Sequence, residues 1–258
     1  QGNLTVGMIM VGRDLLLTCH PGETANEIKA KNPLQFSYLP VETNGQIIGL
    51  YNAERWFSEE APSTPVADDF VLLSEETIIG ADASIFDFLS QADHNPTNLV
   101  VSGNKVSGLV SLHDVQQLPV RAALFALITS LEMAMGFAIK KRWPDDSGWM
   151  SELSDGRFMQ LTEQIEKSKQ VDSYVDHIAF TQFSDKADLI RKSAVLSLTG
   201  KSLKKDLKAI RNLRDNLAHA NAYAQNEEQA KSVCATVRLL YQLKRELLAY
   251  LSSTDAHE

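Results

Sequence analysis

The pattern of hydrophobic and polar positions divides the chain into two halves. In the first half, apolar residues come in short runs separated by Gly, Pro, Asn and Asp, which predicts strands joined by tight turns. In the second half, apolar residues recur every three or four positions over long stretches, which predicts amphipathic helices. The expected fold class is therefore α+β, with a mixed part at residues 1–118 and an all-α helical bundle at residues 119–258.

The predicted elements of the first half occur twice in the same order: strand, helix, two strands joined by a turn, and a second helix. The turns Asn44-Gly45 and Gly103-Asn104 are strong hairpin signals. Between the copies, residues 58–65 are rich in Glu, Ser and Pro, as expected of a linker. The first copy comprises strand Leu15–Thr18, helix Ala25–Lys31, strands Phe36–Val41 and Ile47–Tyr51, and a short final helix. The second comprises strand Thr77–Gly80, helix Ser84–Gln91, strands Leu99–Ser102 and Val106–Ser111, and helix His113–Gln117.

This self-similarity, at a spacing of about sixty residues, indicates a duplicated unit. Five longer helices are predicted after it, at Val120–Arg142, Met150–Lys169, Lys186–Leu198, Ser202–Asn221 and Glu227–Leu251. The run from Ala122 to Ile139 has Glu132 as its only charge and approaches the length of a membrane span. It contains Ser, Thr and Gly, has no Trp or Tyr belt and is just short of about 20 residues. We therefore expect this run to be a buried helix or an oligomer interface, and not a membrane span.

Charge is distributed unevenly along the chain. Residues 1–120 carry 5 Lys and Arg against 15 Asp and Glu, whereas residues 121–258 carry 20 against 18. An acidic first half is a poor nucleic-acid binder, whereas the second half can accept a phosphate backbone locally. The alternative is that its cations form a solvated helix face. Many of them cluster at Lys201, Lys204, Lys205, Lys208, Arg211 and Arg214.

The length of 258 residues and the 44% hydrophobic content fit one or two domains with ordinary cores. The two cysteines, Cys19 and Cys234, cannot form a disulfide framework, and no Cys/His cluster has zinc-ligand spacing. No metal site is expected. Since the N-terminus does not resemble a signal peptide, we expect a reducing, cytoplasmic location.

The third strand of each copy carries a family resemblance. The second copy reads Val106-Ser107-Gly108-Leu109-Val110-Ser111-Leu112-His113-Asp114. It resembles the CBS-domain pattern of Gly, two aliphatic residues, Ser or Thr, any two residues, and Asp. The first copy has the same layout around Gly49 but carries Asn52 and Arg55 at the two polar positions. Residues 1–118 are therefore similar to a CBS pair, with repeats at about 1–57 and 66–118.

This resemblance implies a site for an adenine nucleotide (AMP, ADP or ATP). Ser111 would contact phosphate, since a hydroxyl at a helix start lies where the helix dipole attracts anions. Asp114 would contact the ribose, and the adenine would lie against the backbone near Thr77 and Ile78. His113 is a further possible contact, and the alternative is an ordinary helix start with Ser111 as N-cap.

In the first copy, Arg55, with Asn52, would replace ribose recognition by phosphate contact. No Walker loop, Rossmann fingerprint or Ser/His/Asp set occurs in this half. The first half is therefore predicted to be a sensor.

The most unusual stretch of the second half is residues 211–221. At helical spacing, one apolar stripe passes through Leu203, Leu207, Ile210, Leu217 and Asn221. Arg214 is predicted to project into the middle of this stripe, where a cation needs a partner. The expected partner is Glu132, unless Glu132 lies at a surface edge. Asp215, one helical turn before His219, is expected to orient the imidazole and favour its protonated form.

The same residues permit a purely structural interpretation. Arg211 and Asp215 form an i,i+4 pair, Asn221 can cap the helix, and His219 can be an ordinary surface side chain. Against this stands the sequence Arg214-Asp215-Asn216-Leu217-Ala218-His219, which resembles the HEPN-superfamily signature of Arg, a polar residue, and His after four to six intervening positions. The helical context of the motif, before a last long helix, agrees with that family.

The HEPN resemblance implies a metal-independent ribonuclease that works as a homodimer, or a member without activity that dimerises or binds RNA. In the active case, His219 transfers protons and Arg214 stabilises the charged phosphorane. Asp215 orients the imidazole and Asn216 contacts phosphate or base. A twofold axis would let Arg214 of one subunit act with His219 of the other.

The sequence thus predicts a cytoplasmic homodimer, a nucleotide-regulated, metal-independent endoribonuclease acting on RNA without a required cofactor. The alternative is a non-catalytic, adenine-nucleotide-binding regulatory protein whose helical domain dimerises or binds a partner. A third hypothesis is an antitoxin-like or nucleotide-handling role on the same fold. The sequence leaves open whether the protein is an enzyme.

Overall fold

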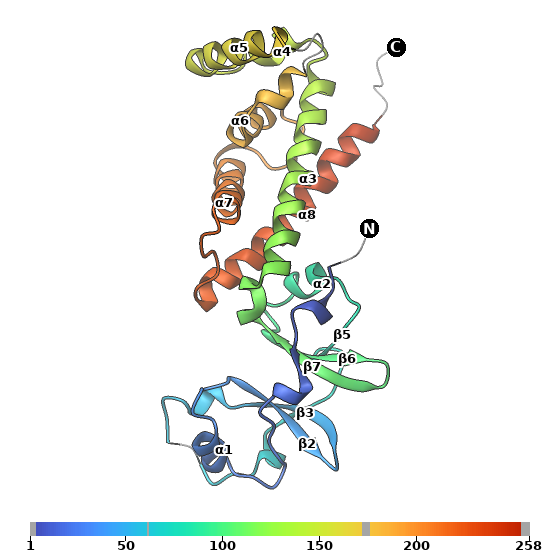
Figure 1. The fold of residues 1–258 in the computed structure, drawn as a ribbon, viewed down its shortest axis with the longest axis vertical. Helices are drawn as coiled ribbons and strands as arrows, with labels where there is room; N and C mark the ends of the chain where they lie inside the picture. The colour runs from blue at the N-terminus through green and yellow to red at the C-terminus, as the bar shows by residue number, and fades with distance from the viewer. Residues whose placement is uncertain (1–3, 61, 172–175, 254–258) are drawn as a thin grey trace. The chain divides into compact units, whose positions relative to one another are not determined.

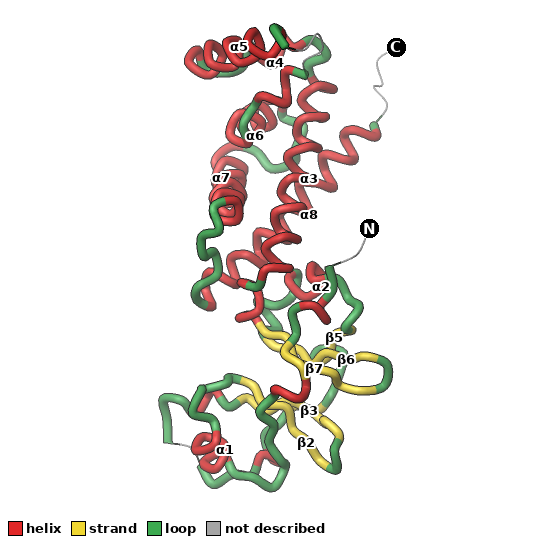
Figure 2. Tube along the Cα trace, in the orientation of Figure 1, coloured by secondary structure: helices red, strands yellow, loops and turns green. Residues whose placement is uncertain are grey.

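The computed structural model describes residues 4–60, 62–171 and 176–253, so Ala61 of the predicted linker lies outside the described residues. The chain forms two compact units, Gln1–Ala123 with Ala224–Cys234, and Leu124–Tyr223 with Ala235–Glu258. Strands occur in the first unit, and the second is helical (Figures 1 and 2). The expected mixed α+β class is confirmed.

The first unit contains two sheets, and each is built around one hairpin. One sheet has the strand order β1-β7-β6-β5 and the other β2-β3-β4. The strands are β1 (Val11–Gly12), β2 (Tyr38–Thr43), β3 (Gln46–Asn52), β4 (Val71–Leu72), β5 (Ile78–Gly80), β6 (Thr97–Ser102) and β7 (Lys105–Ser111). The short helices are α1 (Ala25–Lys31), α2 (Ile85–Leu89) and the 3-10 turns η1 (Val6–Met8), η2 (Arg13–Leu15), η3 (Glu54–Trp56), η4 (Val66–Asp68) and η5 (Leu112–Gln116).

The two hairpins have the same register, which confirms the predicted duplication. Tyr38 pairs with Asn52 in the first, as Thr97 pairs with Ser111 in the second. Each hairpin also has an irregularity at the same place, between Val41 and Glu42 and between residues 100 and 101. Because register and bulge coincide, Asn52 is the structural counterpart of Ser111, and Arg55 is the counterpart of Asp114.

The N-terminal segments of the two repeats are exchanged. β1 lies near the start of the first repeat but pairs with β7 of the second, and β4 lies near the start of the second repeat but pairs with β3 of the first. Matching backbone bonds fix both segments: the Gly7 N–H donates to the Ala81 carbonyl at 2.8 Å, and the Ala67 N–H donates to the Pro21 carbonyl at 2.9 Å. The sequence did not predict β1 and β4, because two-residue strands are too short to show alternation.

The glycine of each third strand permits this exchange. A Cβ atom on Gly49 would lie 2.2 Å from the Val71 carbonyl oxygen, and one on Gly108 would lie 2.4 Å from the Val11 carbonyl oxygen. These distances are far below van der Waals contact, so only glycine lets the exchanged strand approach.

The two sheets share one apolar cluster. It contains Ile47 and Leu50 of the first repeat with Leu99, Val106 and Leu109 of the second. These residues are 0–9% exposed. Each such side chain contributes on the order of 1.5–3 kcal/mol when it is removed from water, so the repeats stabilise one another.

Two predicted elements of the first unit are wrong. Instead of strand Leu15–Thr18, residues Arg13–Leu15 form a 3-10 helix and Cys19 makes a single parallel bridge to Val41. The Arg13 side chain holds the chain there by donating to the Gly45 carbonyl at 2.7 Å. The predicted helix His113–Gln117 is the 3-10 turn η5, which starts one residue earlier.

The helical elements are α3 (Leu118–Arg142), α4 (Asp146–Met150), α5 (Asp155–Lys169), η6 (His177–Phe180), α6 (Phe183–Ser193), α7 (Gly200–Ala218) and α8 (Glu227–Ser252). The predicted helix Met150–Lys169 is interrupted by residues 151–154, and α5 starts after its N-cap, Ser154. The predicted ends of α6 and α7 are too late. Each helix stops at a left-handed alanine, Ala194 with φ 55° and Ala220 with φ 56°.

Helix α3 is long and apolar enough to cross a membrane by length and composition alone, and 56% of its most apolar window is buried inside the structure. Its one acidic residue, Glu132, forms ion pairs with Lys186 and Arg214. Burial and these ion pairs are properties of a core helix of a bundle.

Candidate nucleotide site and the Arg214 cluster

The candidate nucleotide site lies at the end of β7, where the chain turns into η5. The Asp114 carboxylate accepts from the Ser111 backbone N–H at 2.7 Å and from the Ser111 hydroxyl at 3.1 Å. The structure therefore brings together the two polar residues of the motif. To donate to an anionic phosphate, the Ser111 hydroxyl must turn away from Asp114, which accepts its proton here.

The other Asp114 oxygen is bound by a residue that the sequence did not single out. The Gln117 amide donates to Asp114 Oδ1 and to the Ile9 carbonyl, each at 2.7 Å. Burial raises the pKa of the Asp114 carboxyl above its ordinary value, and the bonds from Ser111 and Gln117 oppose that rise. Burial thus costs stability at neutral pH, and this cost disappears as the pH falls through the raised pKa toward the ordinary value.

Ile78 begins β5, which is the last strand in its sheet, and Thr77 directly precedes it. The Thr77 carbonyl accepts from the Leu99 N–H at 2.8 Å, and the Ala81 N–H donates to the Val101 carbonyl at 2.9 Å. Backbone groups of successive residues in a strand point to opposite sides. The N–H and C=O of Ile78 therefore face the open edge of the sheet, where a flat base can be hydrogen bonded.

The corresponding place in the first repeat is occupied by protein groups. The Asn52 side chain accepts from the Glu54 N–H at 3.0 Å, and Arg55 Nε donates to the Asn52 carbonyl at 3.1 Å. The Arg55 guanidinium also pairs with Asp69, and its carbon lies 5.8 Å from the ring centroid of Trp56. A phosphate at Arg55 would therefore have to share the guanidinium with Asp69.

In the helical unit, Arg214 lies at the edge of the apolar stripe of α7, and the prediction that it fills the middle is wrong. The buried positions are Leu203, Leu207, Ile210, Leu213 and Leu217. Leu213 thus fills the place that the sequence assigned to Arg214, and Asn221 is exposed beyond the helix end. The Arg214 side chain is 36% exposed.

Glu132 links Arg214 to a buried lysine. Glu132 Oε2 lies 3.5 Å from Arg214 Nε, so the ion pair that the sequence predicted is present. Glu132 Oε1 lies 3.1 Å from Lys186 Nζ, which also donates to the Thr181 carbonyl at 2.8 Å. Lys186 is 7% exposed and was not predicted to be buried, because a single lysine in a polar segment gives no sequence signal of burial.

The remaining residues of the predicted catalytic set are arranged differently from the expectation. His219 is the exposed C-cap of α7, and its backbone N–H donates to the Asp215 carbonyl at 3.0 Å. The Asp215 carboxylate lies 3.4 Å from Arg214 Nη1, so the structure pairs Asp215 with Arg214. The Asn216 carbonyl accepts from the Asn221 N–H at 2.9 Å, and Arg211 is exposed.

No group of three or more His, Cys, Asp or Glu side chains placed to hold a metal ion occurs within residues 4–60, 62–171 and 176–253. Both cysteines are buried, and burial raises the pKa of the Cys19 thiol to about 12. A thiol with that pKa is protonated at neutral pH and is a poor nucleophile.

Solved structures that resemble the N-terminal part of the chain are CBS domains, and they cover about 45% of its length. A CBS domain of a bacterial CNNM/CorC-family Mg²⁺ transporter, solved in complex with ATP, is 20% identical and has a TM-score of 0.38, covering 45% of this chain and 86% of that one. CBSX2 in complex with AMP is 18% identical with a TM-score of 0.37, over 46% and 96% of the two chains. The CBS domains of a transcriptional regulator from Streptococcus pneumoniae are 17% identical with a TM-score of 0.37, over 43% and 95%. No protein-family model and no curated protein matches the chain.

Proposed function

We propose that this protein is an adenine-nucleotide-responsive regulatory protein, in which the CBS-like pair senses the nucleotide and the helical unit carries the output. The observation that carries the proposal is the Ser111–Asp114 pair at the end of β7, in the sheet whose last strand, β5, has an open edge. The Asp114 carboxylate can accept from the ribose hydroxyls of a nucleotide, and the Ser111 hydroxyl can bond its phosphate. The outward-facing backbone groups of Ile78 can bond its base.

Gln117 supplies a route from the site to the helices. A ribose that binds Asp114 Oδ1 competes with the Gln117 amide, which holds that oxygen at 2.7 Å. Gln117 directly precedes α3, so release of its side-chain amide removes the bonds that tie the start of the helix to the Asp114 carboxylate and the Ile9 carbonyl. A ligand alters an equilibrium only when it favours one state, and this competition gives the nucleotide such a preference.

Titration calorimetry with AMP and ATP, the nucleotides of the two CBS-domain complexes named above, tests the site. Asp114→Asn is expected to weaken binding more than about tenfold, since a hydrogen bond to a charged group contributes about 1.5–3 kcal/mol. Because burial disfavours the charged carboxylate, the neutral isostere is expected to fold. Nucleotide binding that is unchanged by Asp114→Asn would contradict the site.

Gln117→Ala tests the competition separately. Without its competing donor, Asp114 is expected to bind the nucleotide several-fold more tightly, and Gln116→Ala, at the adjacent position, is the control. If Gln117→Ala weakens binding as Asp114→Asn does, Gln117 positions the carboxylate and the competition mechanism fails.

A second candidate function, a metal-independent ribonuclease of HEPN type, is favoured by the surroundings of Arg214. The Arg214 guanidinium contacts Glu132 through Nε and Asp215 through Nη1, and its side chain is 36% exposed. His219 is exposed one turn later, and Lys201, Lys204, Lys205, Lys208 and Arg211 line the exposed part of the same helix. A cation and a basic helix can bind the phosphates of RNA, and an accessible imidazole can transfer the protons that cleavage needs.

A cleavage assay on single-stranded RNA without divalent metal, in the presence and absence of ATP, separates the two candidates. The ribonuclease predicts that His219→Ala abolishes cleavage, whereas His94→Ala, at an exposed histidine of the first unit, leaves it unchanged. Absence of cleavage by the wild-type protein under both conditions leaves only the regulatory function.

We further propose that the protein is a homodimer that associates through α3. Phe125, Met133 and Phe137 are 41%, 58% and 56% exposed and recur at multiples of four residues. Side chains at that spacing lie on one side of a helix, and their contact with the same face of a second copy would remove them from water.

A further inference from the structure

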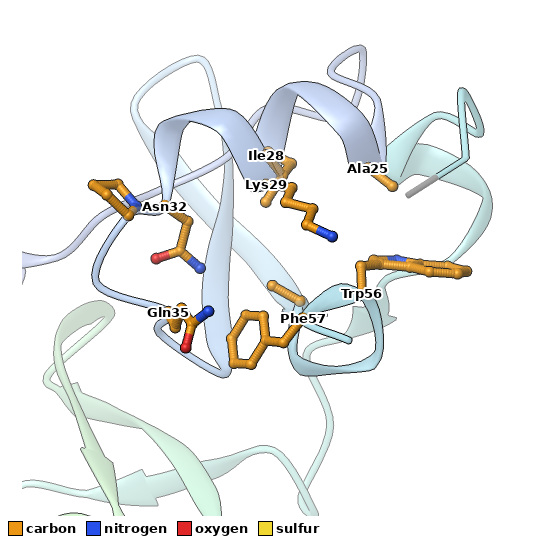
Figure 3. Close-up of a pocket in the computed structure, with 9 residues that line it drawn as sticks. Ala25, Ile28, Lys29, Asn32, Gln35, Trp56 and Phe57 are labelled. Carbon is orange, nitrogen blue, oxygen red and sulfur yellow. The ribbon is translucent and has the colours of Figure 1, made fainter. Parts of the chain in front are cut away.

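A cavity of about 160 Å³ opens in the first repeat, between α1, the loop that follows it and the turn after β3. Its floor is apolar and buried, because Ala25, Ile28 and Ala53 are only 1–4% exposed. Trp56 and Phe57 add two half-buried aromatic side chains. Figure 3 shows Trp56 on one side of the cavity and Asn32 and Gln35 on the other, with Lys29 between them.

The rim of the cavity is polar, and Lys29 is the charged residue among those that line it. The Lys29 ammonium donates to the Glu59 backbone carbonyl at 2.6 Å, a neutral acceptor that a stronger one can replace. The Asn32 amide bonds Phe36 twice, since it donates to the Phe36 carbonyl and accepts from the Phe36 N–H, both at 2.9 Å. These bonds hold the loop that closes one side of the cavity.

In the second repeat, the positions that correspond to this cavity carry buried apolar side chains. With the offset of 60 that relates α1 to α2, Ile85, Phe88, Leu89 and Ala92 stand where the first repeat has Ala25, Ile28, Lys29 and Asn32. All four side chains of the second repeat are 0% exposed. The first repeat therefore has a smaller residue on the floor and a cation on the rim at positions that are solid core in the second.

We propose that this cavity binds a monocyclic aromatic carboxylate. Its size fits one ring, since an engineered apolar cavity of about 150 Å³ holds benzene, whereas drug-sized ligands need roughly 300–1,000 Å³. Trp56, Phe57 and Ile28 contact the ring, and the Lys29 ammonium exchanges the Glu59 carbonyl for the carboxylate. The lysine charge selects an anion over its neutral analogue.

Benzoate and its neutral isostere benzamide are the probes, measured on the full chain by saturation-transfer NMR and titration calorimetry. Lys29→Leu, which installs the residue of the second repeat, is expected to weaken benzoate binding up to about fivefold and to leave benzamide unchanged, as for the loss of an exposed ion pair. Lys105→Leu, at an exposed lysine of the β6–β7 hairpin, is the matched control and is expected to change neither affinity.

Ala25→Ile, which also copies the second repeat, is expected to fill the floor and abolish binding of both probes. Asp114→Asn is expected to leave benzoate binding unchanged, so that this site and the nucleotide site can fail separately. The proposal is overturned if wild-type protein shows no saturable benzoate binding, or if Lys29→Leu and Ala25→Ile both leave the benzoate affinity unchanged.

Discussion

Two alanines, Ala194 and Ala220, have left-handed backbone conformations, with φ of 55° and 56°. Each lies at the end of a helix. The Asn221 N–H donates to the Asn216 carbonyl at 2.9 Å, and the Ala220 N–H donates to the Leu217 carbonyl, which together are the hydrogen bonds of a Schellman motif. Glycine normally occupies the left-handed position, because a Cβ atom there is strained.

Replacing either alanine by glycine is therefore expected to stabilise the protein, by about 0.5–1 kcal/mol at each position. Ala209→Gly, at an exposed position inside α7, is the control and is expected to destabilise by about 1 kcal/mol. Urea unfolding measures all three free energies. A loss of stability for Ala220→Gly would show that the left-handed turn is not the end of α7.

The ion pairs of Glu132 with Lys186 and Arg214 predict that substitutions of Glu132 and Arg214 lower the free energy of unfolding by unequal amounts. Glu132→Ala leaves Lys186, which is 7% exposed, without its carboxylate and is expected to cost about 3 kcal/mol. Arg214→Ala removes a partner that is 36% exposed and is expected to cost less than about 1 kcal/mol. Equal losses in urea unfolding would mean that Arg214, and not Lys186, is the principal partner of Glu132.

Single residues also show where sequence reasoning succeeds and fails. An acidic residue in an apolar helix and a cation near a stripe were enough to predict the pair of Glu132 and Arg214. The position of Arg214 was misassigned because Leu213 and Arg214 follow Ile210 by three and four residues, and both spacings continue an apolar stripe. The end of α7 was missed because its left-handed residue is Ala220, and alanine ordinarily favours continuing a helix.

At the scale of elements, the exchanged strands depend on the glycines of the third strands. Gly49→Ala and Gly108→Ala would each place a Cβ less than 2.5 Å from a backbone oxygen of the exchanged strand. We expect each substitution to displace that strand and to lower the free energy of unfolding by about 2 kcal/mol or more.

Gly156→Ala, in α5, is the matched control, since an added Cβ there meets nothing within 4 Å. Helix propensity predicts a neutral or stabilising effect of up to about 1 kcal/mol for it. If Gly108→Ala were as harmless as Gly156→Ala, the pairing of β1 with β7 would not contribute to stability.

The hairpins were predictable because turn dipeptides and apolar runs are local signals, and the duplication followed from their repeated order. The exchange was not predictable, because β1 and β4 gain their stability from pairing with a distant repeat and from the absence of a side chain at Gly49 and Gly108. Gln117 was overlooked at the candidate site for a similar reason. Its role depends on the Ile9 carbonyl, which only the fold brings near.

At the scale of the whole molecule, the proposed dimer predicts that a charge on the exposed face of α3 separates the subunits. Met133→Glu is expected to shift sedimentation equilibrium toward monomer by more than tenfold in dissociation constant, because a carboxylate would have to be buried at the interface. Met159→Glu, at a position of α5 that is 71% exposed, is the control. A wild-type protein that is monomeric at all concentrations would contradict the dimer.

The central claim is that the end of β7 binds an adenine nucleotide through Asp114. Calorimetric titration of wild-type protein and Asp114→Asn with AMP and ATP tests it most directly. The account predicts saturable binding of at least one of the two nucleotides by the wild type, weakened more than about tenfold by the substitution while the fold is retained. Absence of binding to the wild type, or equal affinity in both proteins, would contradict it.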